Sequence, residues 1–322
     1  MATWQTAHGY TTPDTSRRRG AFSHLAFFYR DERAYLSELV AFANAGLASG
    51  EPVFIAVPGP KGSLLREHLA KPGNLRFADM GQLGRNPARI MAEVQDFIEC
   101  HPQQRVRYIG EPIWPGRSAA EIREATRHEA LINLAFSETS ATIICPYDMA
   151  GLAPAVIGEA WCTHPGILAN GRVTAATRYA GPGNFPPECD RPLPTPPVNA
   201  ETLDYETDLR QLRSFVAHHA HRAGLRDERA SDLVLAASEI AANTLRHTGG
   251  AGTLDIWHTD AEVLCQIHDQ GRISDPLAGR THHAPDERGH GLRVVNQVCD
   301  LAELRTGRNG TTIRLHMRIR DR

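Results

Sequence analysis

The sequence predicts two domains of different class: an α/β domain with a three-layer parallel sheet at residues 20–180, and an α+β domain at residues 204–322. The length of 322 residues suits two hydrophobic cores better than one. Between the domains, "GPGNFPPECDRPLPTPPVNA" (181–200) is rich in proline and has no apolar periodicity. Because proline sustains neither a helix nor a central strand, we interpret residues 181–203 as a stiff, extended linker.

Four short runs in the first domain are apolar almost throughout: "PVFIAVPG" (52–59), "LRFADM" (75–80), "VRYIGE" (106–111) and "ATIICPYD" (141–148). Helical patterns lie around them, at about 31–49, 61–70, 86–100, 117–136 and 153–162. Apolar runs that alternate with helices are typical of parallel strands covered on both faces.

The second domain has a different order of elements. Two helical patterns, 205–223 and 228–247, precede the strand-like runs "GTLDIWHT" (252–259) and "EVLCQIHD" (262–269). The dipeptide "DA" between these runs predicts an antiparallel hairpin. A loop, a helix at 290–299 and two last strands complete the expected α+β fold.

Composition excludes several classes of function. A formal charge of −2 and a pI near 6.8 give no attraction for nucleic acid or anionic lipid. Six cysteines are scattered without a CxxC pair, which favours reduced thiols and a cytoplasmic protein. No apolar run is long enough for a membrane helix, so we expect no membrane partner.

The helix at 228–247 carries Glu239, Asn243 and His247 four residues apart, at the margin of its apolar stripe. This spacing alone fits a solvent-facing edge as well as a site. Further along the chain stand "IHDQG" (267–271) at a strand end, "RGHGL" (288–292) before a helix, and "GTTIRL" (310–315). An aspartate can accept a hydrogen bond from an adenine amino group, and glycines ahead of a helix let its N–H groups meet phosphates.

In this order, the four segments resemble the GHKL (Bergerat) ATP-binding fold, an α+β sandwich shared by gyrase and the histidine kinases. "ASEIAANTLRHTGG" is most similar to the anti-sigma-factor serine/threonine kinases. The resemblance implies ATP and Mg²⁺ as cofactors, Glu239 as the catalytic general base and Asn243 as the Mg²⁺ ligand. It implies nucleotide contacts from Asn243, His247, Asp269, Gly271, Arg288, Gly289, Gly291, Leu292 and Thr311, and a lid at 274–288.

One departure from the family pattern concerns the glycine-rich segment after Asp269. Ile273 stands where the second glycine of Asp-x-Gly-x-Gly is expected, and we expect this departure to affect nucleotide affinity more than the fold.

Two sets of histidines raise the question of a zinc site. They are His218, His219 and His221 in one helix, and His282, His283 and His290 in or beside the predicted lid. We disfavour zinc for either set, because no cysteine or carboxylate stands at a zinc-ligand spacing from them. We also disfavour a phospho-accepting histidine. Two-component histidine kinases carry a dimerising helical hairpin before this domain, whereas a proline-rich linker and one helix are expected here.

Segments of the first domain resemble the MEDS sensory domain of regulators in methanogens and methylotrophs. They include "HLAFFYRDERAYLSELVAFANAGLASGEPVFIAVPG", "GEPIWPGRSAAEI", "HEALINLAF" and "ATIICPYD". The resemblance implies a RecA- or KaiC-like sheet that has lost its P-loop. In "VPGPKGSLL" (57–65), indeed, the glycines and lysine have the wrong spacing for a P-loop.

A sensory ligand is expected at the carboxyl ends of the parallel strands. The residues there are Asp79, Glu111, Trp114, Arg117, Tyr147 and Asp148. The alternative is that Glu111 pairs with Arg117 to hold a loop and that Tyr147 only packs. His128, Glu129 and Asn133 fit a helix surface as well as a site.

These expectations describe a cytoplasmic regulator in which a small-molecule sensor controls an ATP-dependent serine/threonine kinase. Its partner would be a sigma factor or an anti-sigma-factor antagonist; a homodimer is left open. The alternative is a non-catalytic partner-binding protein in which nucleotide is structural or absent. A third interpretation makes the first domain an enzyme that acts on a small molecule.

Overall fold

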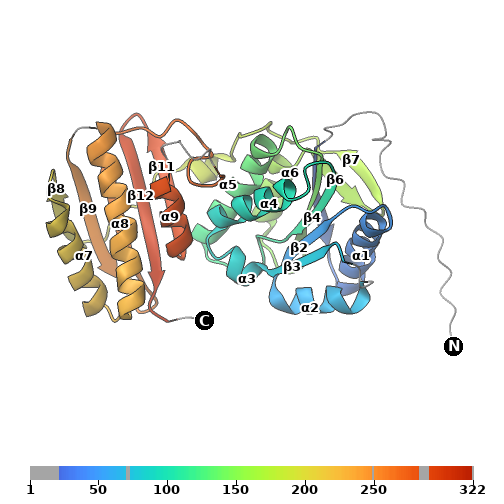
Figure 1. Cartoon of the computed structure of the whole chain (residues 1–322), viewed down its shortest axis with the longest axis horizontal. Coiled ribbons are helices and arrows are strands. Elements are labelled where there is room, and N and C mark those ends of the chain that lie inside the picture. Colours follow the sequence, from blue (N-terminus) through green and yellow to red (C-terminus); the bar gives the residue numbers. More distant parts are fainter. Residues whose placement is uncertain (1–21, 70–72, 249, 283–289, 321–322) are drawn as a thin grey trace. The chain divides into compact units, whose positions relative to one another are not determined.

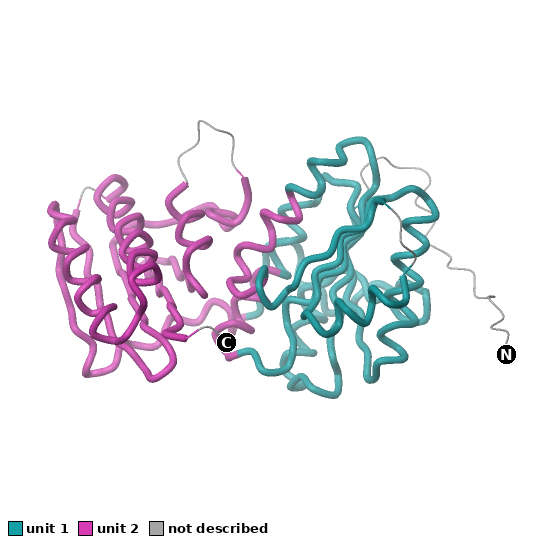
Figure 2. Tube along the Cα trace, turned by 60° about the horizontal axis from the view of Figure 1, so that its bottom comes forward, with its two compact units in different colours: residues 1–83, 96–117, 129–186 teal, residues 84–95, 118–128, 187–322 magenta. Residues whose placement is uncertain are grey.

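The computed structural model describes residues 22–69, 73–248, 250–282 and 290–320. The chain divides into two compact units (Figure 2). The first holds residues up to 83, 96–117 and 129–186, and the second holds 84–95, 118–128 and 187–322. Among the described helices, none is long and apolar enough to cross a bilayer.

The first unit contains a seven-stranded sheet in the order β3-β2-β4-β5-β1-β6-β7, parallel except for β7, which is antiparallel to β6 (Figure 1). Its strands are β1 (Ser23–Tyr29), β2 (Val53–Val57), β3 (Leu75–Asp79), β4 (Val106–Gly110), β5 (Ala141–Asp148), β6 (Gly166–Ala169) and β7 (Arg172–Ala175). The helices of this part of the chain are α1 (Glu32–Ala48), α2 (Gly59–His68), α3 (Met80–Leu83), α4 (Ile90–Glu99), α5 (Ala119–Ala135) and α6 (Pro154–Thr163), with a 3₁₀ turn at Pro87–Arg89.

Helices cover both faces of this sheet. On one face, alternate residues of β1, β2, β4 and β5 pack in one core with α1 and α2. On the other face, Phe54 of β2 lies 5.3 Å from Phe97 of α4, and Phe28 of β1 stacks on Trp161 of α6 at 5.3 Å between ring centroids. The expected α/β architecture is therefore present. Sequence reasoning missed β1, which lies inside the sheet between β5 and β6, and the β6–β7 hairpin.

The second unit contains a five-stranded antiparallel sheet in the order β11-β12-β10-β9-β8. Its elements are β8 (Glu201–Tyr205), α7 (Leu209–Arg222), α8 (Asp227–Thr248), β9 (Gly252–His258), β10 (Glu262–Asp269), α9 (His290–Val298), β11 (Leu301–Gly307) and β12 (Gly310–Arg318), preceded by a 3₁₀ turn at Pro187–Asp190. Apolar residues of all three helices and of the sheet form one core. An antiparallel sheet with helices packed on one face is the expected α+β arrangement.

The start of this unit differs from the prediction. Residue 205 is not the beginning of a helix but the last residue of β8, which pairs with β9. Leu203 and Tyr205 alternate toward the core, which explains the strand. The helix begins only after Asp208, whose carboxylate accepts from Arg210 N at 2.8 Å. The expected boundary between linker and domain, 203/204, therefore falls inside a strand.

Part of the predicted linker contacts the outer face of the second sheet, opposite the helices. Arg305 donates from Nε to the carbonyl oxygen of Arg191 (3.1 Å), and Arg314 donates to that of Pro194. Arg314 also donates to Gln266 Oε1 at 2.6 Å. Arginines that project from the sheet thus bind the backbone of the proline-rich segment.

On the same outer face, His316 lies between two carboxylates. Its Nδ1 is 3.1 Å from Glu262 Oε2, and its Nε2 is 3.1 Å from Glu303 Oε2. Burial alone would lower the pKa of His316, but the two hydrogen bonds and charges raise it to about 9. Burial alone would raise the pKa of Glu303, whereas His316 and Arg305 lower it to about 2.

This arrangement predicts a pH-dependent contribution to stability. Since the pKa of folded His316 is raised, its contribution is complete below the unfolded value near 6.5 and is lost as pH rises through about 9. We expect His316→Gln to lower the free energy of unfolding by about 2 kcal/mol at pH 6, and to have little effect above pH 9. Urea unfolding of both proteins across this range measures the difference. An equal difference at both ends of the range would contradict the ion-pair assignment.

Candidate nucleotide site

The helix α8 places Glu239 and Asn243 against the first turn of α9. A Cβ added at Gly291 would lie 2.9 Å from Glu239 Oε2 and 3.0 Å from Asn243 Nδ2, closer than a side chain allows. Glycine at 291 therefore lets the beginning of α9 approach both polar groups. Glu239 and Asn243 are partly exposed, whereas His247 is exposed in the last turn of α8.

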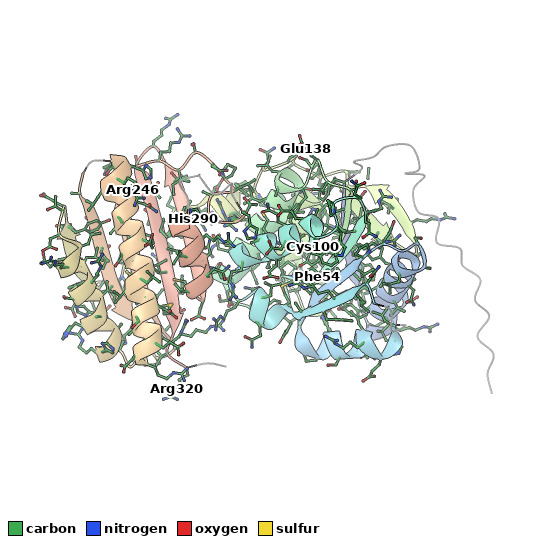
Figure 3. All side chains as sticks on the ribbon, viewed as in Figure 1. Phe54, Cys100, Glu138, Arg246, His290 and Arg320 are labelled. Carbon is green, nitrogen blue, oxygen red and sulfur yellow. The ribbon has the colours of Figure 1, made fainter. Side chains whose placement is uncertain are left out.

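The amide of Asn243 has a cationic neighbour. Arg246 donates from Nη1 to Asn243 Oδ1 at 2.9 Å, and Figure 3 labels Arg246 near the C-terminal end of α8. The arginine is exposed. One carboxylate, one amide and one guanidinium thus lie along the C-terminal half of α8, beside the N-terminus of another helix, where backbone N–H groups favour anions.

Asp269, the last residue of β10, is held by hydrogen bonds to both of its carboxylate oxygens. Thr244 Oγ1 of α8 donates to Oδ2 at 2.6 Å, and Gly271 N donates to Oδ1 at 2.7 Å. Tyr205 OH in turn donates to Thr244 Oγ1 at 3.1 Å. The carboxylate is therefore oriented before any ligand binds, and each oxygen retains a lone pair that can accept from an amino group.

Gly271 and Thr311 complete this part of the site. A Cβ at Gly271 would lie 2.8 Å from Thr248 Cγ2 and 2.9 Å from Asp269 Oδ1, so a larger residue there would displace one of these side chains. Thr311 Oγ1 donates to Gly271 O at 2.9 Å and lies 2.9 Å from Thr306 Oγ1. The threonine fixes the backbone immediately after Asp269.

The described part of the predicted lid, 274–282, contacts α9. Asn296 donates from Nδ2 to Gly279 O at 2.9 Å, and a Cβ at Gly279 would lie 2.6 Å from Leu292 Cβ. Leu292 also packs on the hydrophobic core. Leu292 therefore has a packing role, and its contact with nucleotide stays a prediction. The predicted residues Arg288 and Gly289 lie outside the described residues.

In the first unit, Glu111 lies buried directly after β4. Tyr29 OH donates to its Oε1 at 2.9 Å, Tyr35 OH donates to its Oε2 at 3.2 Å, and Lys61 Nζ lies 2.5 Å from Oε1. Burial raises the pKa of Glu111, while the charge of Lys61 opposes that shift. Lys61 belongs to "VPGPKGSLL", so the lysine of this segment binds a carboxylate of the protein.

The other predicted sensory residues have local roles. Asp79 Oδ1 accepts from Gly81 N at 2.8 Å, and Asp148 Oδ1 accepts from Ala150 N at 2.9 Å. The Arg117 guanidinium lies 4.4 Å from the Trp114 ring, and Arg117 Nη1 donates to Pro112 O at 2.6 Å. Tyr147 is buried. Glu111, Tyr147 and Asp148 do lie at the same edge, because β4 and β5 are parallel neighbours.

Two family models match the chain. Residues 23–165 match the MEDS domain, described as the methanogen/methylotroph, DcmR sensory domain, and residues 202–317 match the histidine kinase-like ATPase domain. The chain carries a MEDS domain followed by a histidine kinase-like ATPase domain. No curated protein matches it. This pair of domains indicates a signalling regulator with a kinase-like ATPase domain.

The departure at Ile273 has a structural explanation in the ATPase domain. The Ile273 side chain packs against the core, and its N–H donates to Thr306 Oγ1 at 3.2 Å. Within the described ranges, only Asn170 among non-glycine residues has a positive φ, so the backbone at 273 needs no glycine. Isoleucine is accommodated without backbone strain.

Sequence reasoning missed three polar residues of the ATPase domain. The sequence patterns single out neither Thr244 nor Thr306, and they place Tyr205 at the start of a helix. A hydroxyl on a buried helix face needs a hydrogen-bond partner. For Thr244 that requirement was the available signal, and the partner is Asp269.

Proposed function

We propose that the protein is an ATP- and Mg²⁺-dependent serine/threonine kinase of the anti-sigma type, regulated by its MEDS domain. One observation carries the proposal: α8 holds Glu239 and Asn243 one turn apart against Gly291, and its Thr244 orients the acceptor Asp269. A single rigid helix thus carries a carboxylate and an amide, and it orients a second carboxylate that could accept a hydrogen bond from an adenine amino group.

In this proposal, Asp269 accepts a hydrogen bond from the adenine amino group, and Gly271 leaves room for the base. Gly291 and the N-terminus of α9 bind phosphate through backbone N–H groups. His247 and Thr311, together with Arg288 and Gly289, are proposed as further nucleotide contacts. Glu239 accepts the proton of the attacking hydroxyl while the new O–P bond forms and ADP leaves; the proton then passes to solvent.

The residues present fit Mg²⁺. The Asn243 amide oxygen is a hard, neutral ligand of the kind that Mg²⁺ accepts alongside phosphate oxygens and water. Because Oδ1 now accepts from Arg246, an exposed side chain, that hydrogen bond can be exchanged for the cation without breaking the core. When bound, Mg²⁺ supplies neutralisation of the phosphate charge.

The proposed protein partner is a sigma factor or an anti-sigma-factor antagonist that offers a serine or threonine hydroxyl. The proposed signal is a small molecule at the carboxyl ends of β4 and β5 in the MEDS domain. Glu111 with its tyrosines, and Trp114 with Arg117, supply polar and stacking groups there.

Incubation of the full chain with γ-labelled ATP, Mg²⁺ and candidate antagonist proteins tests the proposal. Label on serine or threonine of one candidate, lost in Glu239→Ala, supports the kinase. The second candidate function is partner binding without transfer. The hydrogen bond from Arg246 to Asn243 Oδ1 is the observation for it, because this bond must first be given up before Oδ1 can bind a cation. Co-purification of a partner that is never labelled would select this alternative.

A further inference from the structure

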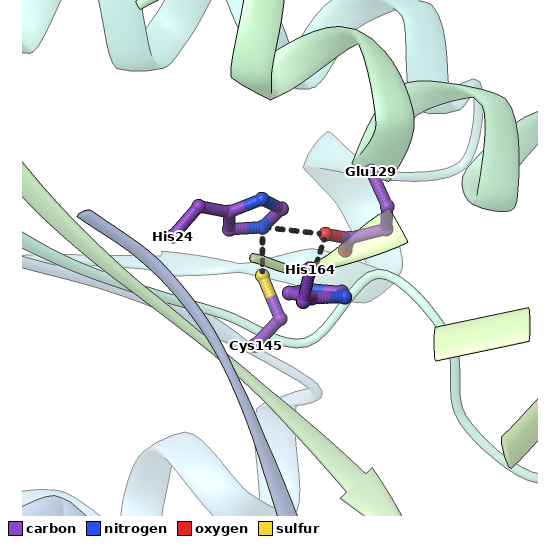
Figure 4. A group of neighbouring side chains, drawn as sticks. All are labelled: His24, Glu129, Cys145 and His164. Atoms are coloured by element: carbon purple, nitrogen blue, oxygen red, sulfur yellow. Dashed lines mark hydrogen bonds and ion pairs between the residues drawn. The ribbon is translucent and has the colours of Figure 1, made fainter. Parts of the chain in front are cut away.

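Four side chains converge inside the MEDS domain, away from the carboxyl ends of β1 and β5. His24 comes from β1, Cys145 from β5, Glu129 from α5, and His164 directly follows α6 (Figure 4). Their possible ligand atoms all lie within 4.8 Å of one another. All four residues are at most 1% exposed. In the part of the chain that the structure describes, these histidine, cysteine and carboxylate side chains are therefore close enough together to hold a metal ion.

Hydrogen bonds fix which ring nitrogens carry protons. Asn133 Nδ2 donates to the backbone oxygen of Thr163 at 2.7 Å, so its Oδ1 is the atom that faces His24 Nδ1 at 3.1 Å. His164 Nδ1 lies 2.9 Å from Ala160 O, which can only accept. Both Nδ1 atoms therefore carry hydrogen. In each neutral imidazole, the lone pair is on Nε2.

Both Nε2 atoms point at the same carboxylate oxygen. Glu129 Oε2 lies 3.0 Å from His24 Nε2 and 3.1 Å from His164 Nε2, and Cys145 Sγ lies 3.4 Å from His24 Nε2. Within this group, Glu129 Oε1 is buried without a hydrogen-bond partner in the described part of the chain, and His164 Nε2, although 3.1 Å from Glu129 Oε2, forms no hydrogen bond of normal geometry there. The lone pairs of both Nε2 atoms therefore face the Glu129 carboxylate with too few hydrogen atoms between them.

Protonation alone does not resolve this arrangement. With both imidazoles charged, two cations whose ring centroids are 4.0 Å apart face one carboxylate, which leaves a net buried charge. With one imidazole charged, the Nε2 lone pair of the other still lies about 3 Å from Glu129 Oε2, and only His24 Nε2 has a second neighbour, the weak donor Cys145 S–H. Either state is costly in the interior. A divalent cation with two imidazoles, one carboxylate and one thiolate makes the group neutral.

The separations also suit such an ion. In a tetrahedral zinc site, ligand atoms lie about 2.0–2.3 Å from the metal and hence roughly 3.3–3.7 Å from one another. Three of the six separations among the four ligand atoms, at 3.0, 3.1 and 3.4 Å, are within a few tenths of an ångström of this range, and the others do not exceed 4.8 Å. The outer partners Asn133 Oδ1 and Ala160 O hold the histidine Nδ1–H groups, as carbonyl oxygens do around zinc-bound histidines.

We propose that the MEDS domain binds one zinc-like divalent transition-metal ion through His24 Nε2, the Glu129 carboxylate, Cys145 Sγ and His164 Nε2. The thiolate and imidazoles favour this class over Mg²⁺ or Ca²⁺. On binding, the Cys145 thiol loses its proton to solvent, and the S–metal bond replaces S–H. Four protein ligands in a buried group make a closed, structural site. It ties β1, α5 and the end of α6 to β5, which carries Tyr147 and Asp148.

The test uses the untagged full chain, purified without added metal under reducing conditions. Elemental analysis should find about one transition-metal ion per chain, removable by a chelator under denaturing conditions. Cobalt(II) added to the refolded apoprotein should give the visible bands of tetrahedral cobalt and a near-ultraviolet thiolate charge-transfer band. This readout does not depend on kinase activity.

Three variants localise the ion. Cys145→Ser should lose the charge-transfer band, while Cys162→Ser, a control at a partly exposed cysteine of α6, should retain it. Asn133→Ala, which removes a positioning residue, should keep the band but weaken metal affinity about 10- to 100-fold. Folded wild-type chain that holds no metal and gives no cobalt spectrum would overturn the proposal. So would a spectrum unchanged in Cys145→Ser. If Cys145→Ser does not fold, the wild-type metal content and cobalt spectrum still decide.

Discussion

Glu239→Gln is expected to lower the rate of phosphotransfer by about 10²- to 10⁴-fold, the usual contribution of a positioned general base. Gln keeps the size of the side chain but does not take up a proton at neutral pH. Because Glu239 is only partly buried and faces Gly291, the substitution should leave the fold and ATP affinity nearly unchanged. Initial rates of label transfer to the identified partner, with ATP saturating, measure the effect.

Glu228→Gln is the matched control, since Glu228 is an exposed carboxylate in the first turn of the same helix. Its transfer rate should equal that of the wild type. If Glu239→Gln transferred phosphate at the wild-type rate, the general-base assignment would be wrong.

Gly310→Ala is expected to destabilise the ATPase domain by about 2–5 kcal/mol. Gly310 opens β12 with φ +99°, a conformation that alanine disfavours, and an added Cβ would lie 2.0 Å from the backbone oxygen of Asp269. Because backbone cannot rotate away as a side chain does, β10 or β12 must shift. Hydrogen exchange of peptides from these strands in increasing urea measures the loss within the two-domain protein.

Gly307→Ala provides the control in the same hairpin. Gly307 pairs with Gly310, is exposed, and has nothing within 4 Å of an added Cβ. Its substitution should change stability by less than about 0.5 kcal/mol. Equal effects of the two substitutions would mean that close contact with Asp269 does not explain the need for glycine.

The sequence revealed features whose signal is local. The runs that became β2, β4 and β5 are apolar on both faces, and the four-residue spacing on α8 does bring Glu239 and Asn243 to one side. β8 was missed because its polar residues alternate with only Leu203 and Tyr205, which also fit the helical pattern that follows. β1 was missed although "SHLAFFY" is mainly apolar, since it runs directly into α1 without a turn signal.

In the candidate sites, too, the sequence does not predict contacts between residues that are far apart along the chain. Thr244 and Asp269 are 25 residues apart, and only the packing of α8 on β10 brings them together. The MEDS cluster is more extreme: His24 and His164 are separated by 140 positions and meet through the insertion of β1 beside β5. Glu129 fitted an exposed helix edge in the sequence. The spacing of residues in one sequence does not indicate that β1 will lie beside a strand as distant along the chain as β5.

The most direct measurement of the central claim is calorimetric titration of the full chain with ATP in the presence of Mg²⁺. Wild-type protein should bind one ATP, and Asp269→Asn should weaken binding about 10- to 100-fold, as expected for loss of a charged hydrogen-bond acceptor. The variant should remain folded, because its amide can accept from Gly271 N and donate to Thr244. No heat of binding with folded wild-type protein, or equal affinity in the variant, would contradict the account.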